Sequence, residues 1–365
     1  MLYNLLIVWL ILLMIFFQGF IKQSSLTKLL FLFISGLTLA MISAFRFETS
    51  GDFYTNYIGF IKTSSMSFKE ILFNYDEYGH MLLRKVISLF AENPQWYFVI
   101  SGLFIVISFL IFIYRYSPNV YLSVLLFVTI GGYFTSHNIT RQYIAIAICL
   151  YAIPYLISRK PIKYFFVTIM AMTFHTSAVV MIPIYFLAKV SIKRKVIVLY
   201  IVTITLITLI YDALFPYLHN LIYSDYYTEG SYGTTGANFL NIILPTLLLI
   251  LLWYFYHIWK KNATKNDALS FKPQEYILYN SLVHMGVLSF FFSLVGVTNM
   301  LILSRLSDYF MVCYLIIIPW ALKFSVRKKR IIIYFCIFIL TLTYFLINNY
   351  LGRLTPTPYT PFWWY

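Results

Sequence analysis

Two segments of this chain place polar side chains around an arginine at the spacing of a helix turn. In SHNITRQYIAIA, Asn138 lies three residues before Arg141, and Gln142 follows directly. Positions three and four residues apart share a helix face, so these side chains should form one polar face that continues into small Ala145. A guanidinium stays charged and binds phosphate oxygens in pairs. We therefore predict that this face binds an anionic, phosphate-like ligand.

The same spacing recurs in the second segment, where Asp308 and Tyr309 follow Arg305. Two more arginines lie beside polar residues: Arg46 opens RFETSGD, and Arg84 lies in an amphipathic stretch. Each of these side chains suits an anion. An arginine can also snorkel to a membrane interface, or pair with an acid only to fix helix packing. Both interpretations stay open for these arginines, whereas the flanking amides favour ligand binding by Arg141.

Proton transfer has three leading candidates, and the outer residues His80 and His137 stay open beside them. His175 is the first, because imidazole titrates near neutral pH. Asp52 and Glu77 are carboxylates beside or near glycines, which permit tight turns. Asp76 next to Glu77 is a weak signal for a metal ion, and the three cysteines lie separately in apolar runs, so we predict no metal and no cofactor. We expect mid-segment His284 to make an interhelical hydrogen bond.

The composition determines what kind of element must hold these side chains. Of the 365 residues, 61% are hydrophobic, 21% aromatic and 11% charged. Soluble domains are nearer 45–50% apolar and about 25% charged. This excludes a cytosolic enzyme, a secreted module and a disordered chain. The absence of a P-loop, a dinucleotide fingerprint and a G-x-S-x-G motif gives no support for ATP-driven transport or serine hydrolysis.

Continuous apolar runs predict an all-α polytopic integral membrane protein with about twelve transmembrane helices in a single domain, 1–365. Two of the runs, 162–174 and 176–188, lie between basic clusters and are too short for two full crossings. We predict a hairpin of short helices with His175 at its turn. The twelve runs are 2–20, 27–45, 97–114, 119–136, 140–157, 162–174, 176–188, 196–215, 239–258, 276–297, 305–322 and 331–350.

The net charge of +15 mostly reports orientation. In an alternating arrangement of the runs, one side of the membrane receives 19 of the 27 basic residues and two of the 12 acids, and we predict that this side is cytoplasmic. A soluble protein with this charge would suggest nucleic acid as a partner, which we do not predict here. The functional arginines listed above are exceptions on the outer side.

Two outer segments are expected to be long, 46–96 and 216–238, and the C-terminal tail 351–365 is also expected outside. In the first, an apolar face should lie opposite Arg84, Lys85 and Ser88, and it comprises Leu82, Leu83, Val86, Ile87 and Phe90. The tyrosines of the second suit sugar rings, or equally an interfacial belt. The tail, which ends in PFWWY, looks like an interfacial aromatic anchor.

The ordered motifs resemble the EpsG-like, Wzy-type polysaccharide polymerases. The most specific pieces are N-x-x-R-Q at Asn138, Arg141 and Gln142, and F-H-x-S-A around His175. Looser pieces are R-x5-D-x-Y, E-x-G and R-L-x-x-Y-F, which begin at Arg46, Glu77 and Arg305. One departure is Tyr78, where the family more often has proline.

The resemblance implies a GT-C-like architecture in the bacterial inner membrane, with the active site facing the periplasm. It implies transfer of a glycan from polyprenyl diphosphate onto the next lipid-linked repeat unit, without a cofactor. Arg141, with Arg305 or Arg46, would bind the diphosphate, helped by Asn138, Gln142, Asp308 and Tyr309. His175, Asp52 or Glu77 would take the acceptor proton. Expected partners are the polyprenyl-diphosphate-linked oligosaccharide, membrane lipids, a chain-length regulator and a flippase.

Two alternatives remain. A glycan ligase of similar architecture would join finished polymer to a different acceptor. A flippase or other transporter of lipid-linked oligosaccharide would carry charged residues in a mid-membrane cavity on several helices. The clustering of the functional charges at one face favours transfer over transport.

Overall fold

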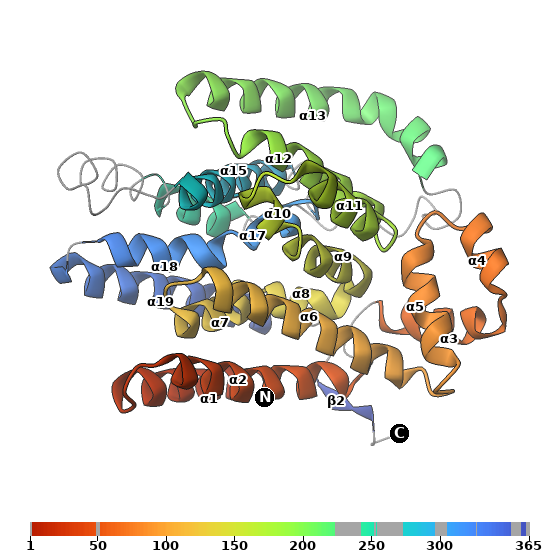
Figure 1. The fold of residues 1–365 in the computed structure, drawn as a ribbon, viewed down its shortest axis with the longest axis horizontal. Helices are drawn as coiled ribbons and strands as arrows, with labels where there is room; N and C mark the ends of the chain where they lie inside the picture. Colours follow the sequence, from red (N-terminus) through yellow and green to blue (C-terminus); the bar gives the residue numbers. More distant parts are fainter. Residues whose placement is uncertain are drawn as a thin grey trace.

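The computed structural model describes residues 2–48, 52–222, 242–251, 253, 273–295, 305–325, 327–351 and 359–362. In these residues the chain forms a bundle of long helices, as Figure 1 shows. Seven helices are long and apolar enough to cross a bilayer, or eight if one bent pair counts as a single span. The chain is therefore an all-α, multi-pass membrane protein.

Each of the twelve predicted apolar runs overlaps a helical segment, but within the described residues this criterion gives seven or eight spans rather than twelve. α13 (Arg194–Ile222) covers the predicted run 196–215, and a short helix, Ile242–Leu251, lies in the run 239–258. The seven spans are Leu2–Gly19 (α1), Ser25–Ala44 (α2), Gln95–Tyr116 (α6), Thr140–Ile157 (α9, Thr140–Leu150, with α10, Ile153–Ile157), Pro273–Val295 (α15), Ser307–Phe324 (α17, Ser307–Met311, with α18, Tyr314–Phe324) and Arg330–Tyr350 in α19 (Arg327–Tyr350).

The bent pair is α7 (Val120–Thr129) and α8 (Gly132–Asn138), whose axes differ by 45°. Gly131 lies between them with φ of 93°, a left-handed conformation that a residue with a Cβ rarely adopts. The glycine therefore ends α7 and starts α8 in a new direction. This bend brings Asn138, at the end of α8, just before α9 and Arg141.

The predicted short hairpin is confirmed. It consists of α11 (Pro161–Met172), a 3₁₀ turn η1 (Thr176–Met181) and α12 (Ile182–Leu187). Its two arms, Pro161–Met172 and Thr176–Leu187, are too short to span, since 12 helical residues reach only about 18 Å of the roughly 30 Å required. His175 lies at the turn between them.

The helices around α9 form the buried core. Every residue from Gln142 to Leu150 is buried, so α9 is surrounded by other helices instead of facing lipid. α2 and α6 pack closely through small residues, because a Cβ on Gly102 would lie 2.4 Å from the Ser43 Oγ. Arg141 is thus carried at the start of a helix whose following residues are enclosed in the bundle.

At one end of the bundle, on the right of Figure 1, three helices run across the direction of the spans: α3 (Phe53–Ser65), α4 (Phe68–Asn74) and α5 (Tyr78–Ser88). They occupy the predicted outer segment 46–96. The predicted apolar face of α5 is wrong in part: Ile87 is buried as expected, but Arg84 is buried as well, whereas Val86 and Phe90 are 44% and 86% exposed. Packing against α3 and α6 turns Arg84 inward, because its guanidinium bonds Asn56 and lies over the Tyr97 ring.

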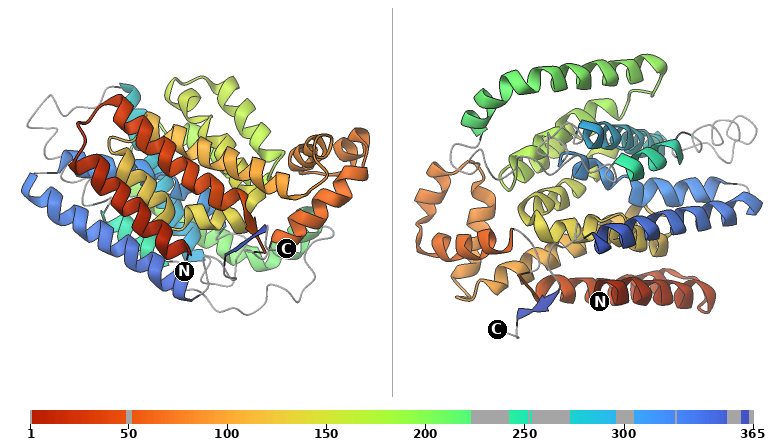
Figure 2. Two further views of the ribbon diagram at one scale, coloured as in Figure 1. Left: turned by 90° about the horizontal axis from the view of Figure 1, so that it is seen from below. Right: turned by 180° about the vertical axis from the view of Figure 1, so that it is seen from behind.

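The C-terminal tail, which was predicted as an aromatic anchor, also forms a short strand. This strand, β2 (Thr360–Pro361), pairs antiparallel with β1 (Arg46–Phe47), which directly follows α2. Figure 2 shows this strand beside the end of α2, at the end of the bundle that carries α3 to α5. The predicted tyrosine-rich part of segment 216–238 lies outside the described residues.

Candidate functional site

The site is organised by the carboxylate of Glu77, the residue that precedes α5. One oxygen, Oε2, forms an ion pair with Arg141 Nη1 at 2.9 Å. The other, Oε1, accepts hydrogen bonds from the Thr176 backbone N–H at 3.1 Å and from the Thr176 Oγ1 at 3.4 Å. Glu77 therefore joins three elements that are far apart in sequence: α5, α9 and the hairpin turn.

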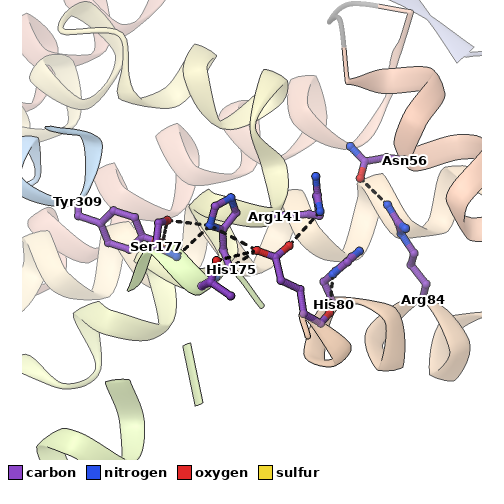
Figure 3. A network of polar contacts seen from close by, with 9 residues as sticks. Asn56, His80, Arg84, Arg141, His175, Ser177 and Tyr309 are labelled. Atoms are coloured by element: carbon purple, nitrogen blue, oxygen red, sulfur yellow. Dashed lines mark hydrogen bonds and ion pairs between the residues drawn. The ribbon is translucent and has the colours of Figure 1, made fainter. Parts of the chain in front are cut away.

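His175 lies on the hairpin side of this carboxylate, with Nδ1 3.7 Å from the Glu77 Oε1. Its Nδ1 lies 2.7 Å from the Ser177 Oγ and accepts the Ser177 backbone N–H at 3.3 Å. The Ser177 hydroxyl oxygen is also hydrogen-bonded to the Tyr309 hydroxyl at 3.0 Å, as Figure 3 shows. Because Nδ1 accepts the N–H bond, we assign the ring proton to Nε2, which makes neutral His175 a hydrogen-bond donor on that side.

A close backbone contact holds α5 against the hairpin turn. The Gly79 N–H donates to the Thr173 carbonyl oxygen at 2.7 Å. A Cβ on Gly79 would lie 2.3 Å from the Thr173 Oγ1 and 2.9 Å from the backbone carbon and oxygen of Thr173. Only glycine permits this approach, which places Glu77 within reach of Thr176.

His80 is the next side chain of the cluster, and its Nδ1 lies 2.8 Å from the Glu77 carbonyl oxygen. Burial lowers the pKa of His80 well below its usual value, and Arg84 and Arg141 lower it further. The imidazole is therefore neutral at pH 7. Figure 3 shows His80 between the Arg141 group and the separate pair of Arg84 and Asn56, whose Oδ1 accepts from the Arg84 Nη2 at 2.6 Å.

Asp52 and Arg305 adjoin the same group. Burial raises the pKa of the Asp52 carboxyl, and the charges of Arg305 and Arg141 oppose this rise, which shows that both arginines lie within electrostatic reach. Gln142, next to Arg141, donates its amide to the Arg305 carbonyl oxygen at 2.7 Å. The two predicted arginine segments are thus fastened together.

The remaining predicted side chains differ in position. Asp308 begins the turn after Arg305, with its N–H donating to the Arg305 carbonyl oxygen at 3.2 Å. Asn138 ends α8, half-buried. Arg46 is 1% exposed, and its guanidinium donates to the Ser43 carbonyl and hydroxyl oxygens and to Thr140 Oγ1. Arg46 thus binds protein groups of α2 and α9.

The structure brings together Glu77, Arg141, His175 and Tyr309, with Asp52 and Arg305 nearby. Our sequence reasoning missed Thr176 and Gly79 as parts of the site. The hydroxyl residue directly after His175 was a signal for the first, and the glycine two residues after Glu77 for the second. In the described part of the chain, no group of three or more His, Cys, Asp or Glu side chains could hold a metal ion.

His284 has the predicted structural role. Its Nε2 lies 2.6 Å from the Val190 carbonyl oxygen, and its Nδ1 lies 2.6 Å from the Tyr200 hydroxyl. The histidine therefore links α15 to α13 and to the connection before α13. These bonds account for both ring nitrogens, far along the chain from the Glu77 cluster.

Fold and site together define a multi-pass membrane protein with an enclosed, charged polar cluster near one end of its helices. Residues 29–362 match the EpsG family, so the chain belongs to this family, which implies a role in exopolysaccharide biosynthesis. No curated protein and no solved structure matches the chain.

Proposed function

We propose that the protein is a polysaccharide polymerase. It would transfer a growing glycan from polyprenyl diphosphate onto the next lipid-linked repeat unit. The observation that carries the proposal is the convergence of Arg141, Arg305, His175 and two carboxylates at one end of the bundle. Family membership adds polysaccharide synthesis as the context.

The two arginines have separate tasks in this proposal. Arg141 is 28% exposed in its side chain and held by Glu77, so it is both oriented and accessible to a ligand. Arg305 is tied to α9 through Gln142. Together they would bind the diphosphate and stabilise the charge that develops on it as the bond to the sugar breaks.

Asp52 is the proton acceptor in the proposed reaction. Glu77 is engaged by Arg141 and Thr176, and the Nδ1 of His175 is engaged by Ser177. Asp52 is a half-buried carboxyl whose pKa is raised by partial burial, and both arginines lie within electrostatic reach of it. The raised pKa makes it a stronger base than an ordinary aspartate, and the arginines keep the ionised form accessible.

The chemical step is an in-line displacement. The acceptor hydroxyl oxygen attacks the anomeric carbon, and its proton goes to Asp52. The bond between that carbon and the diphosphate oxygen breaks, and the electron pair leaves with polyprenyl diphosphate. His175 would donate its Nε2–H to the departing phosphate oxygens. This displacement inverts the anomeric centre.

The wider setting is part of the same proposal. We place the protein in the bacterial inner membrane, with the α3–α5 end facing the periplasm, as the distribution of basic residues favours. A GT-C-like, Wzy-type arrangement with twelve membrane segments, some of them short, agrees with the twelve helical runs. Membrane lipids, a flippase and a chain-length regulator would be its partners.

The test uses cells that lack the chromosomal copy and express tagged variants. Arg141→Ala and His175→Ala should stop chain growth at normal protein level and accumulate a single lipid-linked repeat unit on the outer leaflet. The control is Arg115→Ala, an exposed arginine at the last turn of α6. Normal long polymer in the Arg141→Ala cells would refute the proposal.

The same cells separate the alternatives. A ligase would leave full-length polymer on the lipid carrier without attachment to its final acceptor. A flippase would leave the repeat unit on the inner leaflet, protected from a glycosidase added to intact spheroplasts.

A further inference from the structure

The last described residues of the chain lie on the first outer segment. In the two-stranded sheet, Arg46 pairs with Pro361 and Phe47 with Thr360. The Phe362 N–H then donates to the Phe45 carbonyl oxygen at 3.1 Å. Residues separated by more than 300 positions in sequence are thus joined by backbone pairing.

Aromatic contacts reinforce this pairing on both sides. The rings of Phe45 and Phe362 are stacked with centroids 5.8 Å apart, and Tyr359 meets Tyr3 of α1 edge to face at 6.0 Å. A ladder of two residues is weak by itself. The aromatic contacts therefore supply much of what holds the tail in place.

β1, the strand that pairs with the tail, includes Arg46, whose side chain contacts groups of several helices. Its guanidinium donates to Ser43 Oγ at 2.8 Å and to Thr140 Oγ1 at 3.3 Å, and its Cζ lies 5.1 Å from the Phe98 ring centroid. The Gln95 amide donates to the Arg46 carbonyl oxygen at 3.1 Å. With a pKa lowered by burial to about 10, Arg46 is still charged at neutral pH.

These contacts lead to the proposed active site along α9. Thr140, which accepts from Arg46, is the residue before Arg141 on α9. The position of β1 is therefore linked to the arginine that binds Glu77.

We propose that the C-terminal strand is a positioning element of the active site, and that Arg46 is the side chain through which it acts. The strand fastens β1, and β1 holds Arg46 against Thr140, the residue before Arg141. The activity part of this proposal rests on the proposed polymerase function, whereas the placement of the tail does not.

The placement is tested by a disulfide between Phe47→Cys and Thr360→Cys in a Cys336→Ala background. Directly paired residues of antiparallel strands have Cα atoms about 4.5–5.5 Å apart, inside the range of a disulfide. The pair should cross-link in membranes on mild oxidation. The control pair, Phe47→Cys with Tyr350→Cys at the exposed end of α19, should not, because the sheet pairs Phe47 with Thr360 and α19 is not part of that sheet. Absence of the cross-link in the first pair would overturn the placement.

The positioning role is tested by loss and reversible rescue. Phe362→Ala removes the stack on Phe45 and should shorten the polymer or lower its amount at least tenfold at normal protein level. The surface control Phe90→Ala should not. When the Cys pair is added to Phe362→Ala, oxidation should restore polymer synthesis in vesicles, and reduction should remove it again.

These outcomes separate the two proposals. Full activity of Phe362→Ala, or no response to closing the disulfide, would overturn the positioning role. A protein with the intact tail that makes no polymer in the same vesicles would instead contradict the proposed function, and the cross-linking result would stand on its own.

Discussion

The contact between Gly79 and Thr173 gives the sharpest test of how the site is assembled. In Gly79→Ala, the new Cβ would meet the Thr173 Oγ1 at 2.3 Å and the Thr173 backbone carbon and oxygen at 2.9 Å. The hydroxyl can rotate away, but the backbone cannot. Ordinary contact begins near 3.5 Å, so the start of α5 and the hairpin turn must separate by roughly 0.5 Å or more.

This separation should lower both the stability of the protein and its rate of polymer synthesis. Overpacking of this kind costs about 1–3 kcal/mol of stability. The Gly79 N–H bond to Thr173 lengthens, and Glu77, two residues before, moves away from Arg141 and Thr176. Since a 1 Å misplacement can cost about 100-fold in rate, we expect a loss of roughly tenfold in polymer synthesis.

The assay is polymer length and amount in cells, with protein level and the melting temperature in detergent measured in parallel. Gly19→Ala is the matched control, because a Cβ there meets nothing within 4 Å. Thr173→Ala in the Gly79→Ala background should restore little, since the backbone contacts persist. Normal polymer in Gly79→Ala, with a normal melting temperature, would refute the idea that this contact positions Glu77.

Three further predictions concern charge, pH and packing. Glu77→Gln should lower the unfolding free energy by about 1–2 kcal/mol, because Arg141 loses a partly buried partner, and a thermal shift compared with exposed Glu92→Gln measures this. Since Asp52 must be ionised to act as a base and burial raises its pKa, activity in vesicles should fall with acidification above the usual range of an aspartate, and Asp52→Asn should show no such acid limb. Asn280→Ala should cost about 2–3 kcal/mol, seen as a lower melting temperature, because its amide donates to the carbonyls that end α12, at 2.7–3.3 Å.

The sequence predicted the helical membrane class and the short hairpin because both follow from chain length and composition. Apolar runs reveal helices directly, and two basic clusters around 161–188 constrain the chain to turn back. The number of crossings was harder to predict. The runs 162–174 and 176–188 were counted as separate membrane segments although neither helix is long enough to span, and the run 119–136 is bent at Gly131.

The site was predictable in part for a related reason. Arg141, Gln142 and Arg305 were found because their spacing along a helix is local. The links between elements, such as Glu77 to Thr176 and Gly79 to Thr173, join residues about 95–100 positions apart. No pattern within one helix encodes such a pairing, so only the fold reveals it.

The arginines of the predicted outer side show what spacing alone cannot distinguish. Arg46 and Arg84 have the same charge as Arg141 and lie at the same end of the bundle, yet both are under 7% exposed and lie over aromatic rings. A buried guanidinium that already donates to protein oxygens must give up those bonds before it can hold a phosphate. Arg141 keeps more than a quarter of its side chain exposed while Glu77 orients it. Exposure combined with orientation, more than charge, therefore distinguishes Arg141, the arginine that we propose binds ligand, from Arg46 and Arg84, which hold groups of the protein.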